Sequence, residues 1–485
     1  MPNSKNGQSP RPPRPLVVDL DGTLIRGDLL WEALIGLVRQ RAWQLFLLPL
    51  WLLGGRAHFK TQISRFYTPD PSILPYRREV LDYCHAAKRA DRHLILASAS
   101  PKTWVDPVAE HLGLFQTVLS SQGDRNLRGG EKLAAIRVEI GSMPFDYMGD
   151  SRSDAPIWEA AEEAIGLGDS SSVNRVLSRH PNSRILPNKT QPRPRAAIRA
   201  MRPHQWAKNA LVFVPILLAH RIDDGVKLKQ TAACFLLFSM VASAGYIFND
   251  LLDLQSDRAH PSKHRRPIAA GDLPIPHALG LIVGLLFGAF AASAIWLRPE
   301  VTWMLGAYVG MSFAYSSYLK QTLLIDVIVL AGLYTHRILT GGLAAEVSVS
   351  PWLLAFSAFF FLSLAFVKRY LELVHARERD HQVLARRAYQ VGDLGLVENM
   401  GLACGFIAVL VLCLFISSAD VSLLYRSPEL LWLMCPVMFY WIARIWLLAR
   451  RGELDDDPVL FATRDLKSYM AGLLILIIVG AAASW

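Results

Sequence analysis

Two groups of acidic residues, far apart in the chain, have the types and spacing needed for metal-assisted phosphate chemistry. The first is Asp19 and Asp21, which end the apolar run of residues 16–18. On an extended strand alternate residues point the same way, so both carboxylates reach one site. Gly22 lets the chain turn sharply beneath them. Two acids and a turn at a strand end suit a Mg²⁺ site with a nucleophilic carboxylate, although this short motif alone is common and often structural.

The second acidic group lies at the end of a long apolar run. Asp250, Asp253 and Asp257 have the spacing i, i+3, i+7, which predicts one helix face, and Asn249 lies beside that face. Three carboxylates there repel one another, which disfavours burial without a cation. Mg²⁺ carrying a polyphosphate would satisfy them, because oxygen ligands suit the metal and the metal neutralises phosphates. A solvated acidic helix end is the alternative, but it does not explain why the acids begin inside an apolar run.

Basic residues follow this second group directly. The segment 260–271 (HPSKHRRPIAAG) contains Lys263 and Arg266. Acids followed by bases can bind a metal–phosphate complex from both sides. Arg337 lies among apolar residues, where an unpaired charge is costly, so we expect it to contact Asp326 or a phosphate.

The two groups lie in regions of different composition. The chain has 485 residues, 52% hydrophobic and 19% charged, against about 25% charged in ordinary soluble domains. Its mean hydropathy of +0.26 indicates several membrane spans and argues against a disordered, collagen-like or disulfide-stapled protein. Residues 1–200 alternate apolar strands with charged amphipathic segments, whereas residues 201–485 form long apolar runs. The five scattered cysteines lack CxxC spacing and are interpreted as buried small apolar residues.

We predict a disordered N-terminus at 1–14, an α/β domain at 15–177, a basic Pro-rich linker at 178–200 and a membrane domain at 201–485. Nine spans of the membrane domain are expected at 206–220, 230–249, 276–297, 301–319, 323–342, 351–370, 400–418, 428–449 and 468–484.

The apolar segment Trp43–Leu53 is too short to span a bilayer. We interpret it as a buried helix of a cap subdomain. The alternative is an interfacial segment that rests on the membrane.

The loops predict the orientation of the membrane domain. One set of loops holds most of the Lys and Arg residues, including Arg258, Lys263, Arg450 and Arg451, and should face the cytoplasm. No signal peptide precedes the α/β domain, which should therefore stay on the same side. An integral protein of the inner, cytoplasmic membrane is expected, with both active sites facing the cytoplasm. The net charge of +10 follows from these loops, so we expect no nucleic-acid partner.

Four motifs in order over residues 15–170 resemble the haloacid dehalogenase (HAD) superfamily. They are DLDGT from Asp19, the strand ending at Ser98, GGEK with Lys132, and GDSRSD with Asp150 and Asp154. The resemblance implies a Rossmann-like domain with a helical cap at about 28–83. It implies that Asp19 attacks phosphorus, that Asp21 protonates the leaving group and then activates water, and that the carboxylates hold one Mg²⁺. The four carboxylates of that expected magnesium site are Asp19, Asp21, Asp150 and Asp154.

The same resemblance gives Ser98 and Lys132 the role of holding the phosphoryl oxygens. Ser100 is a competing candidate for the part of Ser98. The acid at Asp21 favours phosphatase chemistry over the dehalogenase branch.

The NDxxDxxxD pattern from Asn249 and the nine spans resemble the UbiA superfamily of intramembrane prenyltransferases over about 198–485. Aromatic prenyltransferases of this superfamily carry a second DxxxD cluster after the sixth span, for a second Mg²⁺. Here the loop 368–389 is mainly basic and lacks DxxxD. Together with RPxQWxKN at 202–209, this resembles the decaprenyl-phosphate phosphoribosyltransferase branch. The resemblance implies at least one Mg²⁺ on Asp250, Asp253 and Asp257, and substrate contacts from Lys208, Asn249, Lys263, Arg266, Tyr315, Lys320, Arg337, Lys368, Arg369, Glu372 and Arg387.

The expected fold is therefore an α/β Rossmann-like HAD domain with a helical cap, followed by an all-α, nine-helix transmembrane UbiA-type bundle. The hypothesis is a bifunctional enzyme with phosphoribosyl diphosphate and a polyprenyl phosphate as substrates, whose phosphatase removes the 5-phosphate of the product; a homo-oligomer is compatible with it. One alternative is a prenyltransferase acting on an aromatic or quinone-precursor acceptor, with a fused phosphatase of other specificity. Another is a membrane scaffold or transporter with a regulatory domain.

Overall fold

The structure is a computed structural model that describes residues 13–122, 126–168, 171–187, 191–378, 388–418, 421, 425–454 and 457–484. It divides into two compact units, Met1–Ala200 with Asp250–Gly280, and Met201–Asn249 with Leu281–Trp485. The first unit therefore includes the acidic segment that the sequence analysis assigned to the membrane domain.

The first unit is built on a six-stranded parallel sheet with the order β3-β2-β1-β4-β5-β6. Most of its strands are short apolar runs, as expected of parallel strands covered on both faces. The central strand β1 pairs with β2 and β4, so the ends of these three strands meet at one edge. This confirms the predicted α/β class. The strands are β1 Leu16–Asp19, β2 Leu94–Pro101, β3 Thr117–Ser121, β4 Asp146–Gly149, β5 Glu163–Leu167 and β6 Ser183–Leu186.

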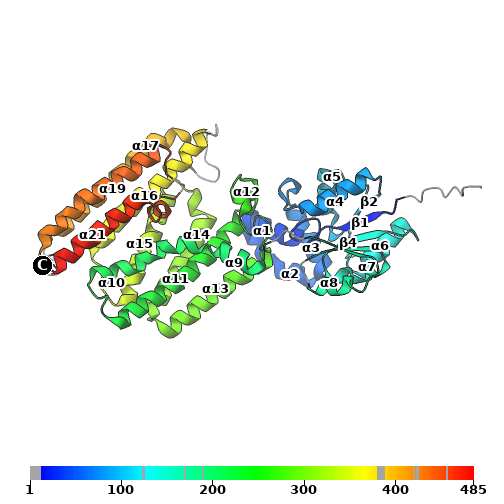
Figure 1. The fold of residues 1–485 in the computed structure, drawn as a ribbon, viewed down its shortest axis with the longest axis horizontal. Coiled ribbons are helices and arrows are strands. Elements are labelled where there is room, and N and C mark those ends of the chain that lie inside the picture. The colour runs from blue at the N-terminus through cyan, green and yellow to red at the C-terminus, as the bar shows by residue number, and fades with distance from the viewer. Residues whose placement is uncertain are drawn as a thin grey trace, which may run out of the picture. The chain divides into compact units, whose positions relative to one another are not determined.

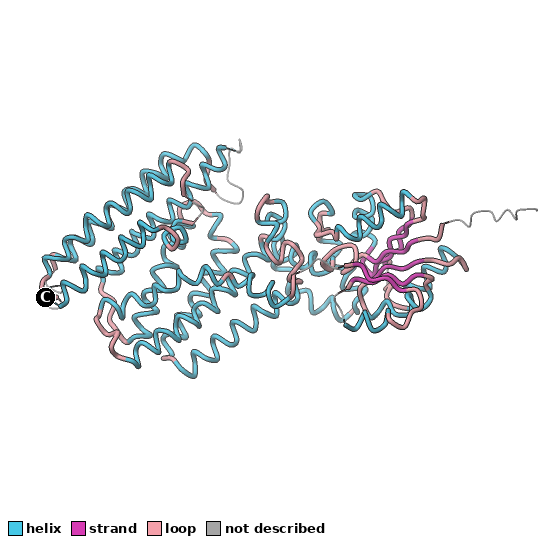
Figure 2. The backbone as a smooth tube through the Cα atoms, viewed as in Figure 1, coloured by secondary structure: helices cyan, strands magenta, loops and turns pink. Residues whose placement is uncertain are grey.

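Helices cover both faces of this sheet, as Figure 2 shows for the magenta strands. One face packs side chains such as Leu96 against Val105, and the other packs Ile95 against Ile136. The strand β6 lies within the segment predicted as a linker and was not anticipated. The helices of the two faces are α4 Arg78–Arg89 and α5 Lys102–Leu112 on the first, and α6 Gly130–Ile140, α7 Ala155–Ala160 and α8 Ser171–Leu177 on the second.

Between β1 and β2 the chain forms a helical insertion where the cap was predicted. It consists of α1 Leu29–Arg41, η1 Ala42–Leu47, α2 Leu48–Leu53 and α3 Gly55–Phe66. The interpretation of Trp43–Leu53 as a buried helix is wrong, because Phe46 is 87% exposed and Leu53 is 84% exposed. Only part of the segment packs inward, with Trp51 stacked on Phe66 at 5.5 Å between ring centroids.

The acidic segment is not one continuous helix. The long helix α11 (Gly225–Leu252) ends before Asp253, and α12 (Leu254–Ala259) begins after it. The amide of Asp257 still donates to the carbonyl of Asp253 at 2.8 Å. The predicted single helix face for the three aspartates is thus interrupted at its middle member.

The second unit is helical (Figure 1). Seven helices of the described chain are long and apolar enough to cross a membrane, including α11 and α13, which both extend into the first unit. The predicted count of nine is not confirmed. The predicted first span, 206–220, instead forms the short elements η4 Pro203–Phe213 and α10 Val214–Leu218. The six candidate spans besides α11 are α13 Ile275–Trp296, α15 Ile325–Ala345, α16 Pro351–Glu378, α17 Leu394–Ile416, α19 Met434–Arg450 and α21 Leu466–Ser484. The helix α14 Pro299–Ser317, at the predicted fourth span, is not among the seven.

Two further α-helices of the described residues are shorter. They are α9 Arg193–Met201, which continues from the first unit into the second, and α20 Pro458–Ala462, which lies between α19 and α21 in the chain. The element η4 packs directly on α15, because a Cβ at Gly341 would lie only 2.0 Å from the carbonyl oxygen of Val212.

Candidate functional site

The ends of β1 and β4 bring three carboxylates together. Asp19 ends β1, and Asp150 directly follows β4, the neighbouring strand. Each of Asp19, Asp150 and Asp154 offers an oxygen within 4.8 Å of the other two. Gly22 makes this approach possible, because its φ is +82° and a Cβ there would lie 2.3 Å from Asp150 Oδ2. A glycine is therefore required on steric grounds at the turn beneath the site.

Lys132 and two hydroxyl groups complete this cluster. Lys132 Nζ donates to Asp19 Oδ1 at 2.6 Å and lies 3.8 Å from Asp154 Oδ1. Thr23 Oγ1 donates to Asp19 Oδ2 at 3.2 Å, and the Tyr147 hydroxyl donates to Asp154 Oδ1 at 3.0 Å. Neither hydroxyl was among the predicted site residues. The signal for Thr23 was its place in the DLDGT motif, whereas Tyr147 has no such signal.

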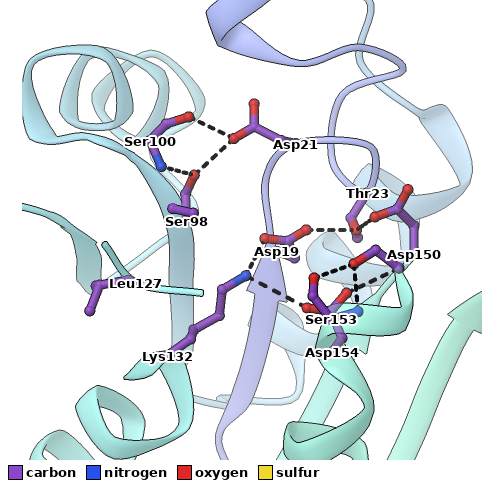
Figure 3. A network of polar contacts seen from close by, with 12 residues as sticks. Asp19, Asp21, Thr23, Ser98, Ser100, Leu127, Lys132, Asp150, Ser153 and Asp154 are labelled. Atoms are coloured by element: carbon purple, nitrogen blue, oxygen red, sulfur yellow. Dashed lines mark hydrogen bonds and ion pairs between the residues drawn. The ribbon is translucent and has the colours of Figure 1, made fainter. Parts of the chain in front are cut away.

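Asp21 points away from this cluster toward β2 (Figure 3). Its Oδ2 accepts from Ser98 at 3.1 Å and from Ser100 at 2.7 Å, and its Oδ1 accepts from the amide of Leu29 at 2.8 Å. Both serines thus reach the same carboxylate, so the choice between them stays open. The side chain of Asp21 lies outside the group of three carboxylates, and a metal-binding role for it stays a prediction.

The charges of the cluster call for a cation. Burial raises the pKa of Asp19 to about 8, against the opposing charge of Lys132 and with repulsion from Asp154 and Asp150. Burial and the charge of Asp154 likewise raise the pKa of Asp150 to about 6. The charge of Arg77 also acts on Asp150, yet the pKa of both acids stays raised, so the cluster is short of positive charge. An all-oxygen donor set of this kind suits Mg²⁺, so the residues fit the predicted ion.

A cavity of about 660 Å³ lies over Asp19 and Asp21. Its walls come from the sheet edge, from the helical insertion and from the segment 258–276 of the same unit. The lining contains more basic than acidic residues, although Arg258 and Arg26 are paired with carboxylates. A phosphate at Asp19 would leave further positive charges for a second anionic group. The basic lining residues are Arg26, Arg56, Lys60, Arg77, Arg128, Lys132, Arg193 and Arg258.

The acidic segment, which contains Asp250, Asp253 and Asp257, is neutralised by an arginine of the loop that follows it. Arg266 donates to Asp250 Oδ1 at 3.0 Å and to Asp257 Oδ2 at 2.6 Å. Burial raises the pKa of Asp257 even though Arg266 opposes that shift. In the part of the chain that the structure describes, a group of acids close enough to share a metal is found at Asp19 and not here. Lys263, the other predicted phosphate ligand of this loop, is exposed.

This segment also packs on α1 within the first unit. Arg258 donates to both carboxylate oxygens of Glu32, at 2.9 and 2.7 Å, and both side chains are buried. A guanidinium nitrogen of Arg26 lies 3.6 Å from Asp272 Oδ1. Arg26 also packs against Gly271, whose φ is +76°. The transferase-type loop and the phosphatase-type domain therefore share a surface inside one compact unit.

In the second unit, Asp326 forms an ion pair with Arg369. Its predicted partner was Arg337. Arg369 Nε lies 2.9 Å from Asp326 Oδ2, and Arg369 also contacts Glu372. Arg337 instead donates to Asn209 Oδ1 and to the Tyr308 hydroxyl, each at 2.9 Å. The expected pairing of Arg337 with Asp326 is therefore wrong.

Other predicted substrate-binding residues lie in two groups, one around Lys320 and one around Lys208. Lys320 Nζ donates to Asn249 Oδ1 at 3.3 Å, and Tyr315 is half-buried on α14. Lys208 contacts Asp457, whose pKa is lowered against the effect of burial by the charges of Lys208 and Lys368.

Sequence reasoning missed Asp457. Its signal was the short acidic run 455–457 before a proline. The predicted Arg387 lies outside the described residues.

Known protein families match both the N-terminal and the C-terminal part of the chain. The model of the UbiA prenyltransferase family matches residues 210–473, and that of the haloacid dehalogenase-like hydrolases matches residues 16–159. An uncharacterized protein, y4nM of Sinorhizobium fredii, is 36% identical over 95% of this chain and 89% of its own length. Nodulation protein NoeC of Azorhizobium caulinodans is 35% identical over 55% of this chain and 86% of its own length.

Decaprenyl-phosphate phosphoribosyltransferase of Mycobacterium tuberculosis is 36% identical over 38% of this chain and 61% of its own length. The family matches cover the two regions in which the two acidic groups lie, the strand end at Asp19 and the segment from Asp250. The chain therefore belongs to the UbiA prenyltransferase family and carries an N-terminal haloacid dehalogenase-like hydrolase domain.

Proposed function

We propose that this protein is a bifunctional membrane enzyme that makes polyprenyl-phosphoryl-ribose. Its UbiA domain transfers 5-phosphoribosyl from phosphoribosyl diphosphate to a polyprenyl phosphate, and its hydrolase domain removes the 5-phosphate from that product. The observation that carries the proposal is the presence, in one chain, of a preassembled phosphatase-type cluster and a region 36% identical to decaprenyl-phosphate phosphoribosyltransferase. The second activity consumes the group that the first leaves on its product.

In the transfer step, a phosphate oxygen of the polyprenyl acceptor attacks C1 of the ribose. The bond from C1 to the diphosphate oxygen breaks, and diphosphate leaves with the electron pair. Mg²⁺ held by Asp250, Asp253 and Asp257 would neutralise charge on that diphosphate. Arg266, which contacts Asp250 and Asp257, is placed to exchange these carboxylates for a phosphate oxygen. The further residues proposed to bind substrate are Lys208, Asn249, Lys263, Tyr315, Lys320, Arg337, Lys368, Arg369, Glu372 and Arg387.

In the hydrolytic step, a carboxylate oxygen of Asp19 attacks phosphorus, and the bond from phosphorus to the C5 oxygen breaks. Asp21 gives a proton to that oxygen and then takes one from the water that cleaves the aspartyl-phosphate. Lys132 and a serine, Ser98 or Ser100, hold the phosphoryl oxygens. Mg²⁺ held by Asp19, Asp150 and Asp154 would neutralise the charge of the phosphoryl group.

Both activities are proposed to face the cytoplasm at the inner membrane. The seven candidate spans support an integral membrane protein, and the positively charged loops support this orientation. Phosphoribosyl diphosphate is a charged, soluble donor, so a site that takes it must be open to an aqueous compartment.

The deciding experiment offers purified protein in lipid bilayers a labelled donor and a polyprenyl phosphate. Phosphoribosyl diphosphate should label the lipid, and mass spectrometry should find the ribose without its 5-phosphate. If only a prenyl diphosphate labels product, the chain is a prenyltransferase of the other branch. If neither donor labels the lipid, the scaffold alternative is favoured. An Asp253→Asn variant that keeps full transfer would contradict the proposed role of Asp253 as a Mg²⁺ ligand.

A further inference from the structure

The helical insertion of the first unit carries an apolar ridge, defined as residues Trp43–Leu53. Besides Phe46 and Leu53, Trp43 is 62% exposed and Leu50 is 64% exposed. The ridge contains no charged residue. Large contiguous apolar surfaces are rare on soluble domains and mark sites of interaction with lipid or protein. Trp51 and Gln44 are buried, and Leu47 and Leu48 pack partly on the core, so these residues hold the exposed side chains of the ridge in place.

The composition of the ridge and its flanks matches a lipid interface. Trp, Phe and Leu are the side chains that bury into the boundary between headgroups and acyl chains, and Trp is enriched there. Exposed Arg39 and Arg41 precede the ridge, and exposed Arg56 follows it. Cations on both flanks of an apolar surface suit the phosphates of lipid headgroups.

A bilayer is within reach of this ridge in every molecule. The same chain contains seven helices able to cross a membrane, and only residues 187–209 connect strand β6 to the region that matches the UbiA family. The hydrolase domain is therefore tethered near a membrane surface. A tethered surface binds at a high effective concentration, so even a modest affinity for lipid keeps it occupied.

The ridge also reaches the cavity over Asp19. Leu52 of the ridge lines that cavity together with Arg56, Phe59 and Lys60 of α3. An apolar entrance thus leads through a basic wall to the nucleophile. This sequence of surfaces suits a substrate with a lipid tail, an anionic linkage and a terminal phosphate.

We propose that the apolar ridge inserts into the lipid interface and that the adjoining cavity takes its phosphomonoester from a lipid of that membrane. The inference rests on the proposed function, because it places the dephosphorylation on a lipid-linked product. The proposed partner of the apolar ridge is the bilayer surface, and not a second copy of the chain or a soluble protein.

Insertion is tested with a nitroxide attached at Phe46→Cys in the full-length protein, reconstituted in vesicles of phosphatidylethanolamine and phosphatidylglycerol. Val138→Cys is the matched control, because Val138 is an apolar residue of the same domain that is 85% exposed. The signal of labelled protein without either substitution is subtracted as background. The label at 46 should collide with lipid-soluble oxygen and be protected from a water-soluble nickel complex, whereas the label at 138 should show the reverse.

Equal access of nickel to both labels would overturn the proposal. Protection of position 46 from both reagents would overturn it as well, because that result points to a protein surface such as a second copy.

The substrate part is tested with Phe46→Glu and Leu53→Glu. Each should lower phosphate release from the lipid-linked ribose 5-phosphate about tenfold, the scale of removing one large apolar side chain from an interface. Release from soluble ribose 5-phosphate should be unchanged, and Val138→Glu should change neither reaction. Equal loss on both substrates in variants that unfold at the wild-type temperature would overturn the inference, since the ridge would then act on the active site and not on access to lipid.

The two failures can be told apart. If wild-type protein does not hydrolyse the lipid-linked substrate while the label at 46 is lipid-exposed, insertion is supported and the proposed function fails. If the lipid-linked substrate is hydrolysed and neither Glu substitution affects it, the inference fails alone.

Discussion

The two acidic groups of the first unit balance their charge in opposite ways. At the sheet edge, Asp19, Asp150 and Asp154 converge, and Lys132 contacts Asp19 and Asp154. Even with the charge of Arg77 acting on Asp150, the pKa of Asp19 and that of Asp150 stay raised, which favours binding of a cation. In the acidic segment, Arg266 lies between Asp250 and Asp257 and supplies the missing charge from the same loop. Strand ends are held rigidly by the ladder of a parallel sheet, whereas an interrupted helix and a loop can rearrange. The first site is therefore preassembled, and the second must exchange an internal partner for its ligand.

The largest effect should come from removing the nucleophile of the preassembled site. Asp19→Asn should lower phosphate release by about 10⁴-fold, the scale of deleting a residue that forms the covalent intermediate. Phosphoribosyl transfer should continue, and mass spectrometry should find the lipid with its 5-phosphate retained. A parallel loss of transfer would contradict the distinction between the two sites, because it would mean that they do not act separately.

A change at Arg266 probes the second site. Arg266→Ala should weaken binding of phosphoribosyl diphosphate about thirtyfold, because a charge-assisted hydrogen bond contributes about 1.5–3 kcal/mol. The neighbouring Arg265, which is exposed, is the matched control as Arg265→Ala. The KM for the donor in the transfer assay measures the effect. Equal behaviour of the two variants would show that Arg266 only neutralises the aspartates.

Gly22→Ala tests whether the preassembled site depends on a close backbone approach. An added Cβ would collide with Asp150, and the positive φ adds strain of about 1–3 kcal/mol, so phosphatase activity should fall at least tenfold. Gly113→Ala is the control, since Gly113 has a φ of +58° but open space around it. It should cost stability in thermal unfolding and leave phosphate release unchanged. Equal losses of phosphatase activity in the two variants would mean that backbone strain, and not the collision with Asp150, causes the effect.

Acid should weaken metal binding at the sheet edge. The pKa of Asp150 is raised to about 6, so below that pH the free protein holds a proton that Mg²⁺ must displace. Asp19, whose pKa is raised to about 8, holds a second such proton below that pH. The magnesium concentration for half-maximal phosphatase activity should be nearly constant above pH 8, rise about tenfold per pH unit between pH 8 and pH 6, and rise about a hundredfold per pH unit below pH 6. The Asp150→Asn variant should lose the steeper part of this dependence along with most of its magnesium affinity. A flat profile in the wild-type protein would contradict the buried, cation-poor character of the cluster.

The amino-acid sequence by itself determined the two-part organisation of this protein and most of the phosphatase-type cluster. Asp19 and Asp150 could be predicted because each lies in a short motif at or next to a strand end, and parallel strands bring such ends to one edge. Lys132, in the first turn of α6, could be predicted because it lies in the third of the four motifs. Hydropathy likewise predicted the seven helices that the structure shows as candidate spans, because a bilayer requires long apolar runs.

Only the tertiary structure decided which distant side chains meet. Arg369, not Arg337, pairs with Asp326, and Lys208 contacts Asp457 across a large part of the chain. The exposure of the ridge at Phe46 also depends on what packs around the insertion, and an apolar segment looks the same in sequence whether it is covered or bare. Periodicity and motifs encode local geometry, whereas ion pairs and burial depend on the packing of elements remote in the chain, which no local pattern specifies.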